Sequence, residues 1–240
     1  MPFLRALAVA ATVLVVAAVG LVALGLAFGN PWLLLPRTPP RSGMDRFLLI
    51  VWPVGCLLEG LLAGLRLQVG HAKAVAVGSG VRLAAACVLG WVLLWGSVHL
   101  RGEPAWLLLA AWAVAAAGVW QVLPRQTSQR VVAAAICFAL VAAGVLIVLG
   151  GWLKGGLAAL PLAVTIGLVA WRVRDKRLRG VVIGCGAAAV VGLVVLGQFF
   201  GRVSVLQAGL IAGSLIAVAV VVSWPRAQPA QAVDAMTSEA

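Results

Sequence analysis

Charged side chains are scarce in this sequence. They make up 10% of its 240 residues, whereas 64% of the residues are hydrophobic. A water-soluble domain usually carries about 25% charged residues, so this composition excludes an ordinary soluble protein. The charges that remain are mainly basic, with 18 Lys and Arg against 6 Asp and Glu. Because these basic residues flank apolar segments, we interpret the net charge of +12 as a topology signal and predict no nucleic-acid partner.

Histidine and acidic residues, which most catalytic and metal sites require, are almost absent. The two histidines, His71 and His99, fall in a loop and at a predicted helix end, so a haem held between intramembrane histidines is excluded. The sequence has no H-E-x-x-H zinc motif and no phosphate loop followed by Lys-Ser or Lys-Thr. Glu103 alone is a thin candidate for chemistry on lipid-linked substrates. We therefore predict a protein that is not an enzyme, with no catalytic residue, no metal site and no cofactor.

Cysteine is equally scarce and equally uninformative about chemistry. All four cysteines lie inside apolar runs, where no oxidising loop would pair them in a disulfide. We interpret them as small packing residues: Cys56, Cys87, Cys137 and Cys185.

What the sequence does have is a series of eight apolar runs. At about 20 residues per bilayer crossing they use most of the chain, and their continuity excludes the alternation of a membrane β-barrel. The sequence therefore predicts an all-α integral membrane protein, a polytopic bundle of about eight transmembrane helices with short loops. One domain would span residues 1–225, followed by a disordered cytoplasmic tail at 226–240. The runs are Ala6–Phe28, Phe47–Leu65, Leu83–Leu100, Ala105–Leu123, Val131–Leu153, Gly156–Trp171, Gly180–Phe200 and Val205–Trp224.

The basic residues between the runs predict the orientation. With the N-terminus inside, twelve Lys and Arg fall in cytoplasmic segments and six in external ones. The positive-inside rule then favours both termini in the cytoplasm, and we take the membrane to be a bacterial inner (plasma) membrane. Arg82 is counted here as a cytoplasmic residue, in a connector that is either a loop or an extension of the third helix.

Glu59 is the only formal charge well inside an apolar run. On the insertion scale it costs about 2.5–3.5 kcal/mol, while the eleven Leu, Ile, Phe and Val of Phe47–Leu65 return roughly 5 kcal/mol, so the run inserts. Desolvation favours the neutral carboxyl unless a basic side chain, Arg66 or Arg82, pairs with it. An ionisable residue in the membrane is also a candidate functional site. Both interpretations of the candidate polar or coupling site at Glu59, Arg66 and Arg82 stay open.

An aromatic stripe marks the third run. Cys87, Trp91, Trp95 and His99 recur every fourth residue, which places them on one helix face. The stripe is either an aromatic-lined site with His99 at its mouth or, more often for such patterns, a face packed on a neighbouring helix.

Small residues predict where helices approach closely. In lipid, apolar side chains gain little by leaving the solvent, so glycine faces that let backbones come together supply the packing. Pro53 and Pro161 additionally predict kinks. The candidate packing glycines are Gly60 and Gly64 in the second run, Gly180, Gly184 and Gly192 in the seventh, and Gly209 and Gly213 in the eighth.

Two further patterns concern the basic residues. Arg82, Arg130 and Arg179 each open a hairpin, at spacings of 48 and 49 residues, so residues 82–124, 130–172 and 179–225 form either a threefold repeat or a regular short-looped bundle. The connector Arg172–Arg179, with the sequence RVRDKRLR, either binds anionic lipid headgroups or only fixes topology.

Two functions agree with these features. The first is a non-catalytic multi-pass membrane protein, a subunit or scaffold of a membrane assembly, with a membrane-protein partner or a second copy as its contact. The second is a small transporter or permease that uses Glu59 for proton or cation coupling. A transporter should enclose a polar cavity at Glu59, whereas a scaffold should expose a small-residue face suited to a partner helix.

Overall fold

The fold is helical throughout the described chain. The computed structural model describes residues 2–30, 32–40, 42–68, 71–95, 103–123, 128–200 and 203–223, and no strand occurs in these ranges. The helices are α1 (Pro2–Ala27), α2 (Gly43–Arg46), the π-helix η1 (Phe47–Val51), α3 (Trp52–Gln68), α4 (His71–Leu94), α5 (Glu103–Val122), α6 (Gln129–Leu149), α7 (Leu153–Arg172), α8 (Lys176–Phe200) and α9 (Val205–Ser223).

Six helical segments of the described chain are long and apolar enough to cross a membrane. They are α1, the continuous rod from α2 to α3, α4, α6, α7 and α8. The apolar helices α5 and α9 have 20 and 19 residues. The all-helical fold with several apolar, potentially membrane-spanning helices is thus confirmed, and the number of eight crossings stays a prediction.

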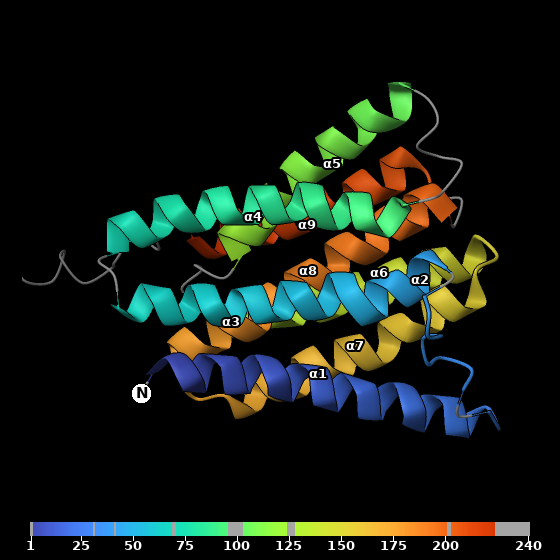
Figure 1. The fold of residues 1–240 in the computed structure, drawn as a ribbon, viewed down its shortest axis with the longest axis horizontal. Helices are drawn as coiled ribbons and strands as arrows, with labels where there is room; N and C mark the ends of the chain where they lie inside the picture. Colours follow the sequence, from blue (N-terminus) through green and yellow to red (C-terminus); the bar gives the residue numbers. More distant parts are fainter. Residues whose placement is uncertain are drawn as a thin grey trace, which may run out of the picture.

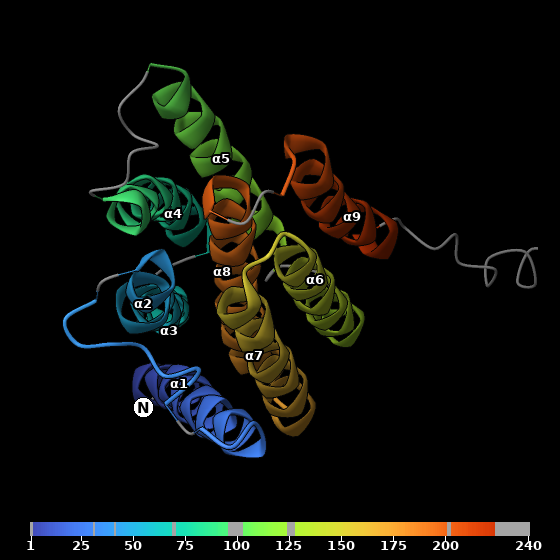
Figure 2. The same cartoon turned by 90° about the vertical axis from the view of Figure 1, so that its right-hand side faces the viewer.

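Helix α8 forms the centre of the bundle. It contacts every other long helix, and the view along the helices shows the others arranged around it (Figure 2). The sequence of α8 explains this position, because glycine and alanine recur on all its sides. Gly192 receives the ring of Phe47 from η1, and Gly186 receives the side chain of Ile136 from α6; a Cβ would stand 2.3 Å and 2.7 Å from them. Small residues therefore let large neighbours interlock with α8 from several directions.

Glycine also brings pairs of outer helices together. Between α6 and α7, a Cβ on Gly144 would stand 2.8 Å from the carbonyl oxygen of Gly156, so the two backbones touch. Between α3 and α1, a Cβ on Gly60 would stand 3.3 Å from the carbonyl oxygen of Ala6, and one on Gly64 would enter the ring of Phe3. Gly60 and Gly64 therefore lie at a close helix contact, as their spacing predicts.

The last helix differs from this prediction. At Gly209 and Gly213 of α9, nothing lies within 4 Å of the position a Cβ would take. These two glycines therefore take no part in close packing within the described chain. Gly180 lies half-buried near the start of α8.

Two helices end in glycine turns that reverse the chain. Gly151 follows α6 with φ +91°, and the N–H groups of Gly151 and Trp152 donate to the carbonyls of Val148 (2.8 Å) and Ile147 (3.0 Å). Gly29 ends α1 in the same way with φ +72°. This Schellman arrangement satisfies carbonyls that the helix leaves open, and its left-handed residue favours glycine. The tight α6–α7 turn lies at one end of the bundle (Figure 1).

The two prolines that predict kinks, Pro53 and Pro161, lie in different surroundings, and the kinks themselves stay predictions. The helix around Pro53 changes to π-helical hydrogen bonding over Phe47–Val51, immediately before the proline, with the N–H of Trp52 donating to the carbonyl of Phe47. A π-turn is one of the known ways to adjust a helix next to a residue that lacks an N–H group. Pro161 lies inside α7, buried against α1 at Gly20.

The connector before the third run proves to be part of the helix. Helix α4 begins at His71 and continues without interruption to Leu94, so Arg82 lies inside it rather than in a cytoplasmic loop. The alanines of this stretch favour a helix, whereas its glycines do not, so residue composition alone does not decide the extension. Of the three predicted hairpins, α6–α7 forms the most extensive contact and α8–α9 a much smaller one, and the threefold repeat stays a prediction.

Candidate functional site: a buried ion pair

The side chains of Glu59 and Arg82 form an ion pair inside the bundle. Arg82 Nε donates to Glu59 Oε1 at 2.6 Å, and Arg82 Nη2 donates to Glu59 Oε2 at 2.8 Å. This two-pronged geometry matches the planar guanidinium to the carboxylate and is the strongest form of such a pair. Glu59 is 2% exposed and Arg82 is fully buried. The pair with Arg82 is one of the two that the sequence leaves open; the side chain of Arg66 lies outside the described set.

The hairpin of α3 and α4 brings the two residues to the same level. Glu59 precedes the end of α3 at Gln68 by nine residues, and Arg82 follows the start of α4 at His71 by eleven. At about 1.5 Å per residue, these positions lie roughly 14 and 17 Å from the turn. Antiparallel helices of these lengths therefore place the charges opposite each other, provided that α4 begins at His71.

Helix α8 closes the site from the other side. A Cβ on Gly184 would stand 2.5 Å from both Cγ and Oε2 of Glu59. Only a glycine at this position leaves room for the carboxylate between α3 and α8. Gly184 therefore lies directly against the Glu59 carboxylate.

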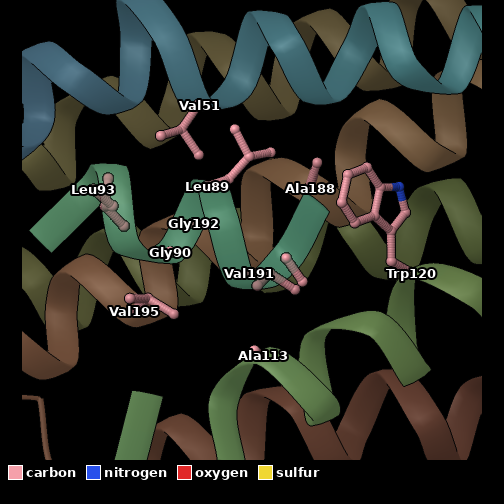
Figure 3. Close-up of a pocket in the computed structure, with 11 residues that line it drawn as sticks. Val51, Leu89, Gly90, Leu93, Ala113, Trp120, Ala188, Val191, Gly192 and Val195 are labelled. Carbon is pink, nitrogen blue, oxygen red and sulfur yellow. The ribbon is translucent and has the colours of Figure 1, made fainter. Parts of the chain in front are cut away.

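A cavity lies close by but does not reach the ion pair. It has a volume of about 50 Å³ and lies between η1, α4, α5 and α8 (Figure 3). Its lining is apolar, with Leu89 and Gly90 of α4 facing Val191 and Gly192 of α8. Neither Glu59 nor Arg82 lines it. The cavity therefore offers no polar route to the carboxylate.

Three polar side chains that a water-filled pathway could use, those of Thr165, Gln207 and Ser214, lie in the described helices α7 and α9. The hydroxyl of Ser214 donates to the carbonyl of Ile211 in its own helix at 2.8 Å. Gln207 and Ser204 exchange hydrogen bonds across the first turn of α9 and cap it. Thr165 is buried within α7. None of these side chains is directed to Glu59 by a hydrogen bond among the described residues.

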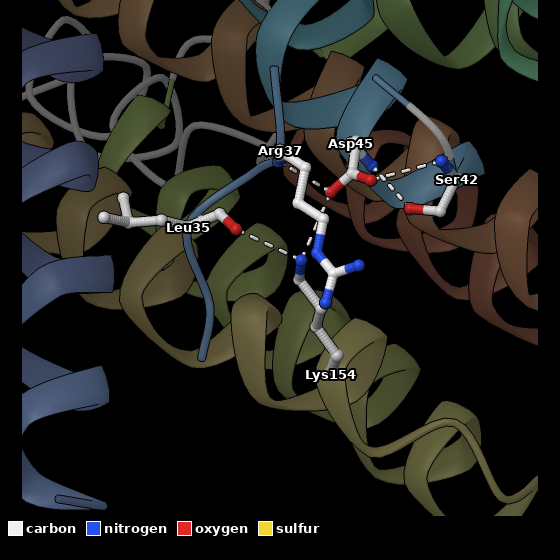
Figure 4. A network of polar contacts seen from close by, with 5 residues as sticks. All are labelled: Leu35, Arg37, Ser42, Asp45 and Lys154. Atoms are coloured by element: carbon white, nitrogen blue, oxygen red, sulfur yellow. Dashed lines mark hydrogen bonds and ion pairs between the residues drawn. The ribbon is translucent and has the colours of Figure 1, made fainter. Parts of the chain in front are cut away.

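A second buried carboxylate, Asp45, ties a loop to the opposite end of the bundle. Asp45 is 2% exposed, and Lys154 of α7 donates to its Oδ1 at 3.2 Å and to the carbonyl of Leu35 at 3.1 Å. The N–H groups of Arg37 and Ser42 also donate to the carboxylate, at 3.2 and 3.1 Å (Figure 4). Every contact is made within the loop or at a helix end, so we interpret Asp45 as a structural clasp. The sequence analysis assigned it no role.

The aromatic stripe of α4 lies on the outside of the described bundle. Trp91 and Trp95 are 40% and 54% exposed, and their rings contact each other at a centroid distance of 4.2 Å and an interplanar angle of 61°. Cys87 is exposed on the same face. His99 lies outside the described residues. Neither ring lines the apolar cavity between α4 and α8.

The basic connector divides into two parts. Arg179 is buried, and its Nε donates to the carbonyls of Ala170 and Val173 at 3.1 Å, while Nη2 donates to Val173 at 2.7 Å. These carbonyls end α7, so Arg179 caps that helix with a charge of favourable sign. The other basic residues of the connector, Arg172, Arg174, Lys176 and Arg177, are exposed.

No group of three or more His, Cys, Asp or Glu side chains gathers in the described ranges to hold a metal. Comparisons with protein-family models, curated proteins and solved structures found no match.

Proposed function

We propose that this chain is a non-catalytic multi-pass membrane protein that serves as a subunit of a membrane assembly, with α9 as the helix that meets its partner. The single observation that carries the proposal is the open glycine face of α9. Gly209, Gly213 and Ala217 recur every fourth residue and are all exposed, with nothing within 4 Å of a Cβ at either glycine. Small residues at this spacing let a second transmembrane helix approach closely.

The rest of the bundle supports this interpretation of the face. Two other small-residue faces of the described bundle are occupied by a helix: α1 lies on Gly60, and α6 meets α7 at Gly144 and Gly156. The face on α9 has no such occupant among the described residues. Exposed Leu206 and Leu210 flank it and would pack around a partner helix. The partner is a helix of a second copy or of another membrane protein.

The ion pair supports the same proposal over the transporter. A carboxylate that exchanges protons or cations needs access to water, whereas Glu59 is paired on both oxygens and enclosed by Gly184. We accordingly propose that Glu59 and Arg82 are structural. We also propose that the protein lies in a bacterial inner membrane with both termini in the cytoplasm. Because Arg82 lies inside the bundle, eleven of the twelve basic residues predicted on the cytoplasmic side remain there, still well above the six predicted outside.

The test is a cross-linking experiment in native membranes. A photoreactive residue at Leu210 should form an adduct with one membrane-protein species, and the double substitution Gly209→Leu with Gly213→Leu should abolish it. The matched control is Gly80→Leu with Gly118→Leu, because these two glycines of α4 and α5 also have nothing within 4 Å. Adducts with lipid alone, or equal loss in both variants, would refute the α9 contact. If vesicles with the wild-type protein show proton- or cation-coupled uptake and Glu59→Gln abolishes that uptake, the protein is instead a transporter.

A further inference from the structure

The cytoplasmic end of α7 combines two surfaces that the bundle itself does not use. Four exposed basic residues surround the α7–α8 connection, and we name Arg172, Arg174, Lys176 and Arg177 the basic turn. It lies at the same end of the bundle as the N-terminus of α1 (Figure 1). The predicted orientation places this end on the cytoplasmic side.

The positive charge of the basic turn is not neutralised by an ion pair with any other residue that the structure describes. Its one acidic residue, Asp175, accepts the backbone N–H of Arg177 at 2.8 Å and thereby caps α8. Neither of the two ion pairs among the described residues lies in this turn. Arg179, the next basic residue along the chain, is buried, and its guanidinium donates hydrogen bonds to carbonyls at the end of α7. Four cationic side chains are therefore exposed at the turn, and the carboxylate of Asp175 among them already accepts a backbone hydrogen bond.

An apolar surface continues directly from the turn along α7. Leu160, Val164, Leu168 and Trp171 are 46–71% exposed and lie on one face, since they are four, four and three residues apart. We name them the apolar row. The row is about 17 Å long at 1.5 Å per residue, close to half the thickness of a bilayer's hydrocarbon core. At its charged end, the guanidinium of Arg130 stands 5.3 Å above the ring of Trp171 and holds a further cation there.

We propose that the basic turn and the apolar row together bind an anionic phospholipid, with its phosphate at the turn and one acyl chain along α7. Each half of the surface matches one half of such a molecule. Arginine pairs with phosphate through two parallel hydrogen bonds, and an interfacial tryptophan sits at the level of the headgroup. A soluble phosphate compound would use the turn and leave the apolar row without a function, so the combination favours the lipid.

The proposal can be tested on the full-length protein in detergent. Phosphatidylglycerol and phosphatidylcholine with identical acyl chains are titrated separately, and bound lipid is measured by native mass spectrometry. The wild type should prefer phosphatidylglycerol. Arg174→Gln with Arg177→Gln should weaken that binding about 30-fold, since each basic residue near an anionic lipid contributes about a fivefold factor. Only side chains change, so the backbone hydrogen bonds of the turn persist.

The matched control removes two exposed arginines elsewhere. Arg5 lies at the same end of the bundle on α1, and Arg37 lies in the loop clasped by Asp45 at the other end. Arg5→Gln with Arg37→Gln should leave phosphatidylglycerol binding within about twofold of the wild type. Equal affinity of the wild type for the two lipids, or equal weakening in both variants, would overturn the proposal. Displacement of the lipid by an equal concentration of glycerol 3-phosphate would also overturn it, because phosphate alone would then be the ligand.

Discussion

The ion pair of Glu59 and Arg82 allows the sharpest quantitative prediction. Replacing Arg82 by Met keeps most of the side-chain volume but leaves the Glu59 carboxylate buried without a partner. Two unit charges about 4 Å apart interact by roughly 4 kcal/mol at an effective dielectric constant near 20. Because Arg82 is fully buried and Glu59 only 2% exposed, little solvent screening reduces this value. Removing one partner of such a pair typically costs about 3–5 kcal/mol.

The double substitution should behave very differently. Glu59→Met with Arg82→Met removes both charges and fills the same space between α3, α4 and α8. Exchanging a buried ion pair for apolar residues of similar volume is often neutral or stabilising. We therefore expect the double variant to be at least as stable as the wild type, although each single variant is destabilised. The free energy of unfolding would be measured by titration with sodium dodecyl sulfate in mixed micelles, followed by far-UV circular dichroism.

Arg174→Met, which removes an exposed arginine from the α7–α8 connection, is the control and should change the unfolding free energy by less than about 0.5 kcal/mol. The reasoning is refuted if Arg82→Met costs less than about 1 kcal/mol. It is equally refuted if the double variant loses the sum of the two single losses, because the residues would then act independently.

Two further substitutions test the surroundings of the pair and of the α7–α8 connection. Gly184→Ala should destabilise the protein by about 1–3 kcal/mol, because its Cβ would stand 2.5 Å from Glu59; in a Glu59→Ala background, the same change should cost markedly less in the unfolding titration. Arg179→Gln should cost about 1–3 kcal/mol by leaving carbonyls at the end of α7 without a donor, and faster amide hydrogen exchange confined to that end would locate the loss. A uniform increase across the bundle would contradict the assignment of Arg179 as a cap.

The importance of Glu59 can be recognised in the sequence, but its partner cannot. A carboxylate within an apolar run stands out without any structure, and Arg66 and Arg82 are both plausible by distance along the chain. The choice depends on whether residues 71–82 are helical, since only a continuous α4 raises Arg82 to the level of Glu59. The stretch contains two glycines and the basic residues Lys73 and Arg82, so composition leaves that question open.

The clasp at Asp45 was missed although a local signal exists. Ser42 and Asp45 have the spacing of a capping box immediately before an apolar run, and the structure shows both hydrogen bonds of that motif. This pattern predicts the start of a helix at Gly43. It does not predict Lys154, which comes from 109 residues further along the chain. A contact of that separation depends on how α7 is placed against the loop.

For the glycines too, the sequence predicts which residues share a helix face, and the structure decides what that face contacts. Their fourfold spacing identifies Gly60, Gly184 and Gly209 equally well as members of small-residue faces. In the structure, Gly60 meets α1, Gly184 makes room for a carboxylate, and Gly209 faces open space. Spacing fixes which residues share a helix face, whereas the rotation of each helix in the bundle decides what that face meets.

Hydropathy and periodicity along the chain therefore determined the apolar helices, their approximate bounds and the one charge that needs explanation. These are local properties, because a helix forms from its own backbone hydrogen bonds and a run partitions into lipid according to its own side chains. Tertiary structure alone decided that α8 is central, that Glu59 pairs with Arg82, and that no described residue covers the glycine face of α9. Those outcomes depend on the register and rotation of separate helices, and many arrangements of equal hydropathy would satisfy the same sequence pattern.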